Sequence, residues 1–356
     1  MSEVRAKKAL GQHFLVDLNI ARKICDALSG GVRPEAGAET RAVAAGSADA
    51  DAETRTRVAG YAGAGAEART MAAGSADAGA EARTKATGTA DADAETRRGV
   101  AASADARLAA DTTAAGAPAA AEEERGGAVP CDVLEVGCGM GVLTQFLLRR
   151  GDITTYGAEI DPESVGYLHA HFPEFAPRLI EGDFLKMNLR ERFPRGLKII
   201  GNFPYNISSQ IFFKVLEHRD LVPECVGMIQ KEVAVRIAEP PGSKEYGILS
   251  VLLQAWYDIE YLFTVNETVF NPPPKVKSAV IRLRRNSVGR LGCDEALFVK
   301  VVKASFGQRR KMIRNSLRAV FGDFGGAEHP FFTQRAEQLS VADFVQLTNW
   351  VAANRK

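Results

Sequence analysis

The sequence lacks the features that mark secreted, zinc-binding and membrane proteins. Its five cysteines are an odd number and include no Cys-x-x-Cys pair, so they offer neither a disulfide framework nor a zinc cluster and predict reduced thiols in the cytoplasm. No apolar run follows the first residues, and a signal peptide is therefore not expected. The most apolar stretch, residues 247–263, contains Asp258 and Glu260 and is too short and too charged to span a bilayer.

The chain also has almost no net charge, because 45 Lys and Arg stand against 44 Asp and Glu. As an average, this balance argues against a nucleic-acid partner. The charges are unevenly distributed, however. Residues 35–128 hold 16 acidic and 10 basic residues, a net of −6, which leaves +7 for the rest. Residues 270–318 hold 13 Lys and Arg against two acids, a net of +11. Such a density is expected of a surface that contacts nucleic-acid phosphates, although a solvated helix face is the alternative.

Residues 35–128 are poor in bulky apolar side chains, and more than a third of them are Ala. They contain four tandem copies of about 14 residues, with Glu53, Glu67, Glu81 and Glu95 in register. This period is below the roughly 20 to 50 residues of solenoid repeats, and no apolar position recurs to build a core. We therefore expect a disordered or transiently helical low-complexity insertion, with a stable helical rod or a binding module as alternatives.

Beyond residue 129, short apolar runs alternate with amphipathic ones. This alternation predicts an open α/β sheet, which binds ligands at the carboxyl ends of its strands. A helix is expected over residues 142–149, directly after a glycine-rich turn. Three of the expected strands are followed by a polar residue. The strands are expected over 132–136, 153–158, 178–181 and 197–201, and the polar residues are Glu159, Asp183 and Asn202.

The glycine-rich turn distinguishes two classes of cofactor. A dinucleotide-binding turn requires Gly or Ala at position 142, where this chain has Val142. Glycine instead occupies Gly137, Gly139 and Gly141, a spacing that resembles the first motif of S-adenosylmethionine methyltransferases. Small residues at these positions let the backbone approach the methionine end of such a cofactor.

Two acids at strand ends complete the candidate cofactor site. Glu159 is placed to accept hydrogen bonds from two ribose hydroxyls. A nicotinamide cofactor would use Glu159 in the same way. Alternatively, Glu159 is an ordinary surface residue without a ligand. Asp183 is placed to accept from an adenine amino group, or to cap the turn that follows it.

The tetrapeptide Asn202-Phe203-Pro204-Tyr205 resembles the Asn/Asp-Pro-Pro-Tyr signature of methyltransferases that act on an amino nitrogen conjugated to a planar ring. The lone pair of such a nitrogen is delocalised, so it is a poor nucleophile. Acceptors from the Asn202 side chain and the Phe203 carbonyl would hold its hydrogens and turn the lone pair toward a methyl donor. Pro204 stiffens the turn, and Tyr205 offers a ring face to the base. An ordinary turn after a strand is the alternative.

Seven motifs in order along the chain together resemble the ribosomal RNA adenine N6,N6-dimethyltransferases. Within that family, the chain is most similar to the bacterial small-subunit branch of the kasugamycin-sensitivity type, which modifies two adjacent adenosines near the 3′ end of 16S rRNA. The resemblance covers essentially all residues outside 35–128. The motifs are residues 8–15, the glycine loop, residues 202–205, 230–233, 246–250, 270–276 and 306–311.

The resemblance implies roles for individual residues. Phe270 would be the second aromatic ring that sandwiches the target adenine against Tyr205, whereas without the family it would be interpreted as a core residue. His13 departs from the more usual Asn, which leaves a side-chain contact between His13 and the cofactor open. The implied contacts with S-adenosylmethionine are His13, Leu15, Gly137, Gly139, Glu159, Asp183 and Asn202.

The resemblance also implies an organisation and partners. We expect a Rossmann-like class I methyltransferase fold with a seven-stranded sheet, formed by residues 1–34 and 129–284, and a small C-terminal helical domain over 285–356 that binds RNA. The expected partner is 16S rRNA within the small ribosomal subunit, with a role in ribosome biogenesis. A cytoplasmic monomer without a metal is expected.

Two other functions remain open at this point. One is the sister group that methylates a single adenosine in large-subunit rRNA, although residues 230–233 and 306–311 favour the small-subunit branch. The other is a non-catalytic RNA-binding or assembly factor on the same fold. The intact Gly137, Glu159, Asp183 and Asn202 argue against that second alternative.

Overall fold

The computed structural model describes residues 4, 6–7, 10–30, 130–308 and 310–355, and these belong to one compact unit. The low-complexity insertion expected over residues 35–128 lies outside the described residues. Its disorder therefore stays a prediction. Among the described residues, no helix is long and apolar enough to cross a membrane.

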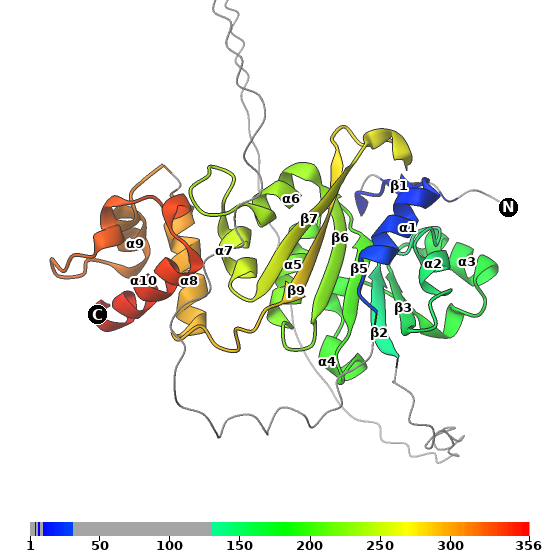
Figure 1. Cartoon of the computed structure of the whole chain (residues 1–356), viewed down its shortest axis with the longest axis horizontal. Coiled ribbons are helices and arrows are strands. Elements are labelled where there is room, and N and C mark those ends of the chain that lie inside the picture. Colours follow the sequence, from blue (N-terminus) through cyan, green and yellow to red (C-terminus); the bar gives the residue numbers. More distant parts are fainter. Residues whose placement is uncertain (1–3, 5, 8–9, 31–129, 309, 356) are drawn as a thin grey trace, which may run out of the picture. The chain divides into compact units, whose positions relative to one another are not determined.

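A seven-stranded sheet forms the centre of this unit, in the strand order β4-β3-β2-β5-β6-β9-β7 (Figure 1). The first five strands of that order are parallel, whereas β9 runs antiparallel to both β6 and β7. This arrangement confirms the expected α/β class and seven-stranded sheet. The strands are β2 Cys131–Val136, β3 Ile153–Glu159, β4 Leu179–Glu181, β5 Lys198–Asn202, β6 Glu224–Gln230, β7 Tyr257–Val265 and β9 Ser278–Arg285.

Both faces of the sheet are covered, which explains why its central strands are mostly apolar. Successive side chains of a strand point to opposite faces. Val133 and Ile200 join a core with helix α1 (Leu18–Ala27), whereas their neighbours Leu134 and Ile199 join the core on the other face. The remaining helices of this part of the chain are α2 Thr144–Leu147, α3 Pro162–His171, α4 Leu189–Arg192, α5 Ser208–Glu217, α6 Lys231–Ala238 and α7 Ile248–Gln254.

The helix expected over residues 142–149 is shorter in the structure, where α2 spans only Thr144–Leu147. The glycine-rich turn continues to Leu143, because Gly141 has a φ of 76° that an α-helix does not allow. The periodic apolar residues were therefore a correct sign of a helix, but not of its length.

The C-terminal helices continue the core of the sheet domain. Trp256, next to β7, lies edge-on to Phe298 of α8 with ring centroids 6.0 Å apart. Apolar residues from the sheet and from these helices belong to one buried cluster. The helices expected beyond residue 285 are thus present, while the domain boundary at that residue stays a prediction. They are α8 Glu295–Gly307, α9 Ile313–Phe321 and α10 Val341–Asn354.

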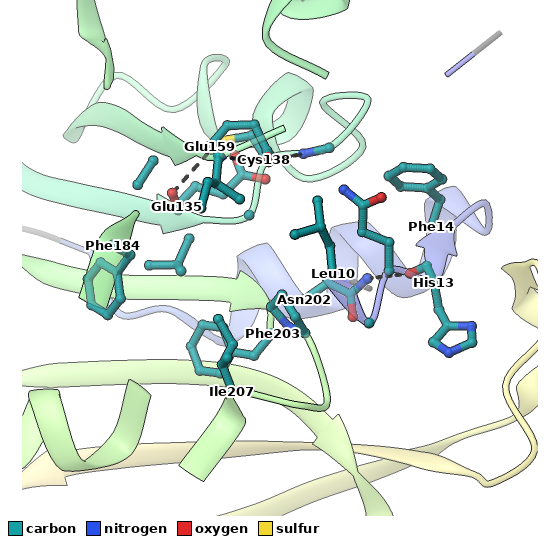
Figure 2. Close-up of a pocket in the computed structure, with 18 of the residues that line it drawn as sticks. Leu10, His13, Phe14, Glu135, Cys138, Glu159, Phe184, Asn202, Phe203 and Ile207 are labelled. Atoms are coloured by element: carbon teal, nitrogen blue, oxygen red, sulfur yellow. Dashed lines mark hydrogen bonds between the residues drawn. The ribbon is translucent and has the colours of Figure 1, made fainter. Parts of the chain in front are cut away.

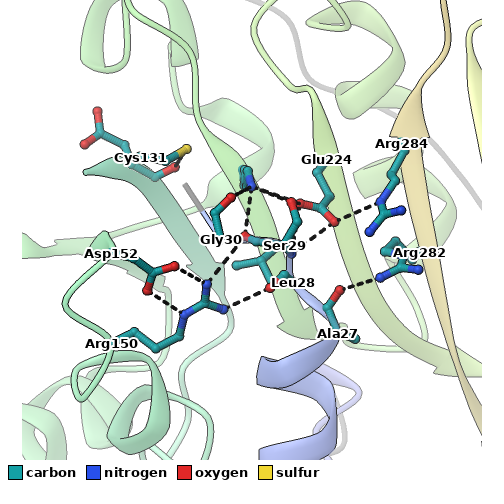
Figure 3. Close-up of polar contacts among 12 residues, drawn as sticks. Ala27, Leu28, Ser29, Gly30, Cys131, Arg150, Asp152, Glu224, Arg282 and Arg284 are labelled. Carbon is teal, nitrogen blue, oxygen red and sulfur yellow. Dashed lines mark hydrogen bonds and ion pairs between the residues drawn. The ribbon is translucent and has the colours of Figure 1, made fainter. Parts of the chain in front are cut away.

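A cluster of charged residues surrounds the end of α1 at the amino-terminal edge of the parallel strands (Figure 3). Arg150 donates to the carbonyls of Cys25 and Leu28, and Lys198 donates to those of Ser29 and Gly30. Arg150 thus binds carbonyls that the helix leaves unpaired at its C-terminus, and Lys198 binds the two residues that follow. The cluster thereby fixes α1, and with it the segment that precedes α1, against the sheet.

Candidate functional site

A pocket opens at the carboxyl ends of strands β2, β3 and β5 (Figure 2). Its lining residues come from five segments that are far apart in the sequence: 10–15, 135–143, 158–160, 182–185 and 202–207. All of the residues expected to contact a cofactor line this pocket, as do Phe203, Pro204 and Tyr205. The sheet edge that the sequence pattern indicated is therefore the edge at which this pocket lies.

The glycine-rich turn follows β2 and forms one wall of the pocket. Gly137, Gly139 and Gly141 have φ values of 76°, 53° and 76°, in the left-handed region that favours glycine. Space imposes a second requirement, because a Cβ on Gly141 would lie 2.4 Å from the ring of Phe172. The spacing of these glycines thus reflects backbone conformation and close packing, and it leaves the wall open for a ligand.

Glu159 ends β3 and is 4% exposed, which contradicts its interpretation as a surface acid. Its Oε2 accepts from the Gly139 N–H at 2.8 Å, and its Oε1 accepts from the N–H groups of Ile160 and Asp161 at 2.9 Å each. Burial raises the pKa of this carboxyl, and the backbone hydrogen bonds partly offset that rise. The carboxylate is therefore oriented by the backbone, and Oε2 keeps the capacity to accept from a ligand hydroxyl.

Glu135, in β2, lines the pocket two residues before the first glycine of the turn, and the sequence analysis assigned it no role. It is 1% exposed and lines the pocket. Burial raises its pKa from 4.5 to about 8, and the Thr144 hydroxyl donates to its Oε2 at 2.6 Å. A carboxyl of this kind is protonated in neutral solution. The signal that could have found it is its place in the strand that leads into the glycine turn.

Asp183 caps the turn that follows it, which was one of its two expected roles. Its Oδ1 accepts from the Leu185 N–H at 2.9 Å and caps the short 3-10 helix Phe184–Lys186. Asp183 also lines the pocket, so the second carboxylate oxygen can face a ligand. The cap fixes the side chain at the pocket wall, which makes the two roles compatible.

The N-terminal residues 10–15, here called the strap, form another wall of the pocket. Strand β1 (Phe14–Leu15) pairs antiparallel with β8 (Phe270–Asn271), so that Leu15 lies opposite Phe270. The ring of Phe14 lies close to Gly139, where an added Cβ would be 3.1 Å from it. A short strand pair thus holds together two segments separated by about 255 residues of sequence.

Asn202 ends β5 and faces the strap. Its Nδ2 donates to the carbonyl of His13 at 2.9 Å, as Figure 2 shows. This contact uses the amide nitrogen and leaves Oδ1 as an acceptor toward the pocket. The ring of the next residue, Phe203, is 1% exposed and lies between Gly201, Gly227 and Phe212. Phe203 can therefore serve the site only through its backbone.

Tyr205 is fixed at its hydroxyl. The Tyr205 hydroxyl hydrogen-bonds the hydroxyl of Ser278, at the start of β9, and burial raises the pKa of the phenol. The ring lies 5.3 Å from that of His13, with the two planes 33° apart. His13 Nδ1 lies 2.9 Å from the Pro272 carbonyl, and Figure 2 shows its ring directed away from Glu159. The His13 side chain thus lies beside Tyr205 and Pro272.

Phe270 is the one predicted site residue that does not line the pocket. It is 3% exposed and packs in the core with Leu15 and Val265. The structure therefore does not bring its ring together with Tyr205. Its role as the second ring of a base sandwich stays a prediction, and that role requires a shift of β1 or β8.

Part of the basic stretch has a structural role. Several of its arginines are paired with acids or bind backbone carbonyls, which makes the surface left for phosphates smaller than the net charge of +11 suggested. Lys275, Lys277, Arg310 and Lys311 are exposed. The paired arginines are Arg282 with Glu260, Arg284 with Glu224 and Glu260, Arg314 with Glu328, and Arg318 with Asp323, while Arg285 binds the carbonyls of Trp256 and Arg219. Within the described ranges, no cluster of His, Cys, Asp and Glu could hold a metal ion.

Comparisons with known proteins relate the chain to enzymes that modify ribosomal RNA. Residues 130–353 match the family described as ribosomal RNA adenine dimethylase. The ribosomal RNA small subunit methyltransferase A of Parabacteroides distasonis is 61% identical over 218 residues, which are 61% of this chain and 81% of that protein. Its counterpart in Bacteroides thetaiotaomicron is 60% identical and is matched over 82% of its length by 62% of this chain. A crystal structure of a dimethyladenosine transferase from Plasmodium falciparum aligns with a TM-score of 0.53 and 25% identity, over 63% of this chain and 90% of that one.

Proposed function

The chain belongs to the ribosomal RNA adenine dimethylase family, and from that premise we propose how its pocket carries out the reaction. The protein is an S-adenosylmethionine-dependent methyltransferase that dimethylates adenine N6 in 16S rRNA of the small ribosomal subunit. Relatives about 60% identical to it are named for the small subunit, which favours this substrate over large-subunit rRNA. The observation that carries the residue assignment is Asn202, which is oriented at the mouth of a pocket lined by the glycine turn.

The pocket fits S-adenosylmethionine. Glu159 would accept from the ribose hydroxyls, Asp183 from the adenine amino group, and Gly137 and Gly139 leave room for the methionine portion. His13 and Leu15 of the strap form another wall of the pocket, to which His13 contributes its backbone. When bound, the cofactor supplies a methyl group on a positively charged sulfur. The residues of the chain therefore need to supply position and acceptors, and no metal.

The acceptor base is held by the segment that follows β5. Asn202 Oδ1 and the Phe203 carbonyl accept hydrogen bonds from the two N6 hydrogens and turn the nitrogen lone pair toward the methyl group. Each transfer forms the N–CH₃ bond as the S–CH₃ bond breaks, and the proton lost from N6 passes to water. Pro204 stiffens this turn, and Tyr205 stacks on the adenine with its own ring anchored through Ser278. Phe270 provides the opposing ring after β8 shifts. The monomethyl product keeps one N6 hydrogen and is accepted a second time.

The RNA is bound largely through its phosphates. Four exposed cations suit this role: Lys275 and Lys277 on the Pro-rich turn, and Arg310 and Lys311 in the turn between α8 and α9. A target adenosine in a single-stranded region is unstacked and inserted into the pocket. Residues 285–356 would act as the RNA-binding part of a monomeric, cytoplasmic enzyme. Affinity for the small subunit should then fall steeply as salt rises.

The direct test is methyl transfer from labelled S-adenosylmethionine to isolated ribosomal subunits that lack the modification. We expect about two methyl groups on each of two adjacent adenines of the small subunit, and none on the large subunit. Label on large subunits alone would favour the sister group. Binding of small subunits without any uptake of label would favour a non-catalytic assembly factor.

A further inference from the structure

An ion pair that does not line the pocket holds the chain just before the strap, at Lys7, and we call this side the outer end of the strap. Lys7 Nζ donates to Asp161 Oδ1 and lies 3.0 Å from Glu163 Oε1. Gln12 Nε2 approaches Asp161 Oδ2 at 3.4 Å, and the Lys7 backbone N–H donates to Gln12 Oε1 at 2.8 Å. Asp161 thus holds the chain at two points, through the Lys7 ammonium and through the Gln12 amide. We call the Lys7–Asp161 pair the latch.

The two ends of the strap are held by different contacts next to different parts of the site. The inner end is held by the β1–β8 pairing and by the hydrogen bond from Asn202 to the His13 carbonyl, beside the proposed position of the target adenine. The outer end is held by the latch. The Asp161 N–H donates to Glu159 Oε1 at 2.9 Å, so the latch lies directly beside the acid assigned to the ribose. The outer end could therefore open while the inner end stays in place.

The latch is built from a buried charge. The Asp161 side chain is 0% exposed, whereas the Lys7 side chain is 36% exposed. Burial alone would raise the pKa of Asp161, but hydrogen bonds from Lys7, Gln12 and Ser164 bring that pKa below its usual value. The carboxylate is thus ionised in neutral solution and depends on these donors. Removing the ammonium leaves a buried carboxylate without its counter-charge, which weakens the closed strap.

Dimethylation makes exchange of the cofactor a repeated step. Each adenine consumes two methyl groups, so one spent cofactor must leave and a fresh one must enter between the two transfers. We propose that Lys7 and Asp161 are positioning residues that set how long S-adenosylmethionine is retained, by holding the strap over the ribose end of the pocket. The inference rests on the proposed function for the identity of the ligand.

The test measures retention of labelled S-adenosylmethionine by the full chain and by Lys7→Met, Asp161→Asn and the double variant. Asn caps a helix as well as Asp does, so Asp161→Asn keeps the cap of α3. Each single variant should release the cofactor roughly tenfold faster, and the double variant should be no worse than either single one. The KM for the cofactor should rise more than kcat falls. Glu163→Gln removes only the exposed partner of Lys7 and should change release by less than about twofold.

Three outcomes would overturn the inference: release at the wild-type rate from both single variants, losses that add fully in the double variant, or a loss of kcat as large as the loss of affinity. If Asp161→Asn lowers the melting temperature, Lys7→Met still decides the question, because Lys7 precedes every helix and strand of the described chain. Absence of cofactor binding by the wild-type chain would instead count against the proposed function itself.

Discussion

Charged side chains are buried at both ends of the parallel strands, which we call the amino-terminal edge and the carboxyl edge, but their roles differ. At the amino-terminal edge, Glu224 is 2% exposed and its two oxygens accept from the Ser29 N–H, the Ser29 hydroxyl, Lys198 and Arg284. At the carboxyl edge, Glu159 is also buried, yet it faces a pocket and has accepting capacity left on Oε2. A buried charge by itself therefore does not mark a site. The combination of a pocket with unused hydrogen-bonding capacity does.

The path of α1 connects these two edges. Asp17 caps its N-terminus just after the strap, and its last carbonyls lie among Arg150 and Lys198 at the opposite edge. The described chain stops there at Gly30 and resumes at Pro130, which directly precedes the first residue of β2. The two described ends, Gly30 and Pro130, therefore lie at the amino-terminal edge of the parallel strands, away from the pocket.

The largest expected effect comes from removing the Asn202 side chain at the carboxyl edge. Asn202→Ala should lower kcat for methyl transfer by about 10³-fold, because the adenine amine loses the group that orients its lone pair. S-adenosylmethionine binding, measured by calorimetry, should be only partly reduced. Asn349→Ala, on the exposed surface of α10, is the matched control and should transfer at the wild-type rate. Transfer by Asn202→Ala at that same rate would contradict the assignment.

The second prediction concerns the amino edge. Glu224→Ala should lower the free energy of unfolding by about 3 kcal/mol, because Lys198 is left buried without its counter-charge. Denaturant unfolding measures this loss, and activity per folded molecule should remain. Glu232→Ala removes an exposed pair with Arg236 and should cost at most about 1 kcal/mol. A reduced affinity of folded Glu224→Ala for the cofactor would contradict the purely structural role given to the amino-terminal edge.

The third prediction follows from the raised pKa of Glu135 at the carboxyl edge. The folded protein keeps a proton on this carboxyl up to about pH 8, whereas the unfolded chain releases it near pH 4.5. The contribution of this group to stability is therefore full below pH 4.5 and is lost as pH rises through about 8. Between pH 6 and 8, Glu135→Gln should remove on the order of 2 kcal/mol of that decline, measured by unfolding at both pH values. An unchanged pH dependence in Glu135→Gln would show that the carboxyl is ionised.

The smallest effect is expected from deleting residues 35–128 and joining the chain with a short flexible linker. Since Gly30 and Pro130 lie at the amino edge, methylation of small subunits should change by less than about twofold. Initial rates on isolated subunits measure this. A large loss of activity, with the melting temperature unchanged, would indicate that the insertion contacts RNA or the ribosome.

Local sequence patterns predicted most of the sheet and most of the residues that line the pocket. The strands expected over 132–136, 153–158, 178–181 and 197–201 match β2, β3, β4 and β5 to within one residue at each end. Such strands are recognisable because both faces are buried and a polar residue follows at the ligand edge. Glu135 was harder to find, since an acid within an apolar strand has no local sign of whether it faces a pocket or a partner.

The sequence by itself determined the chemistry of the site, because the glycine turn, Glu159 and Asn202 each follow a strand and parallel strands end at one edge. Only the tertiary structure decided which charges are free to bind a ligand. Arg284 belongs to the basic stretch that the sequence assigns to phosphate contacts, yet in the structure it is paired with Glu224. The Lys7–Asp161 pair spans 154 residues of sequence, so no local pattern could reveal it. A charged side chain is free to bind a ligand only if no other residue already occupies its hydrogen-bonding groups. Those partners are distant in the sequence, so they are known only once the chain is packed.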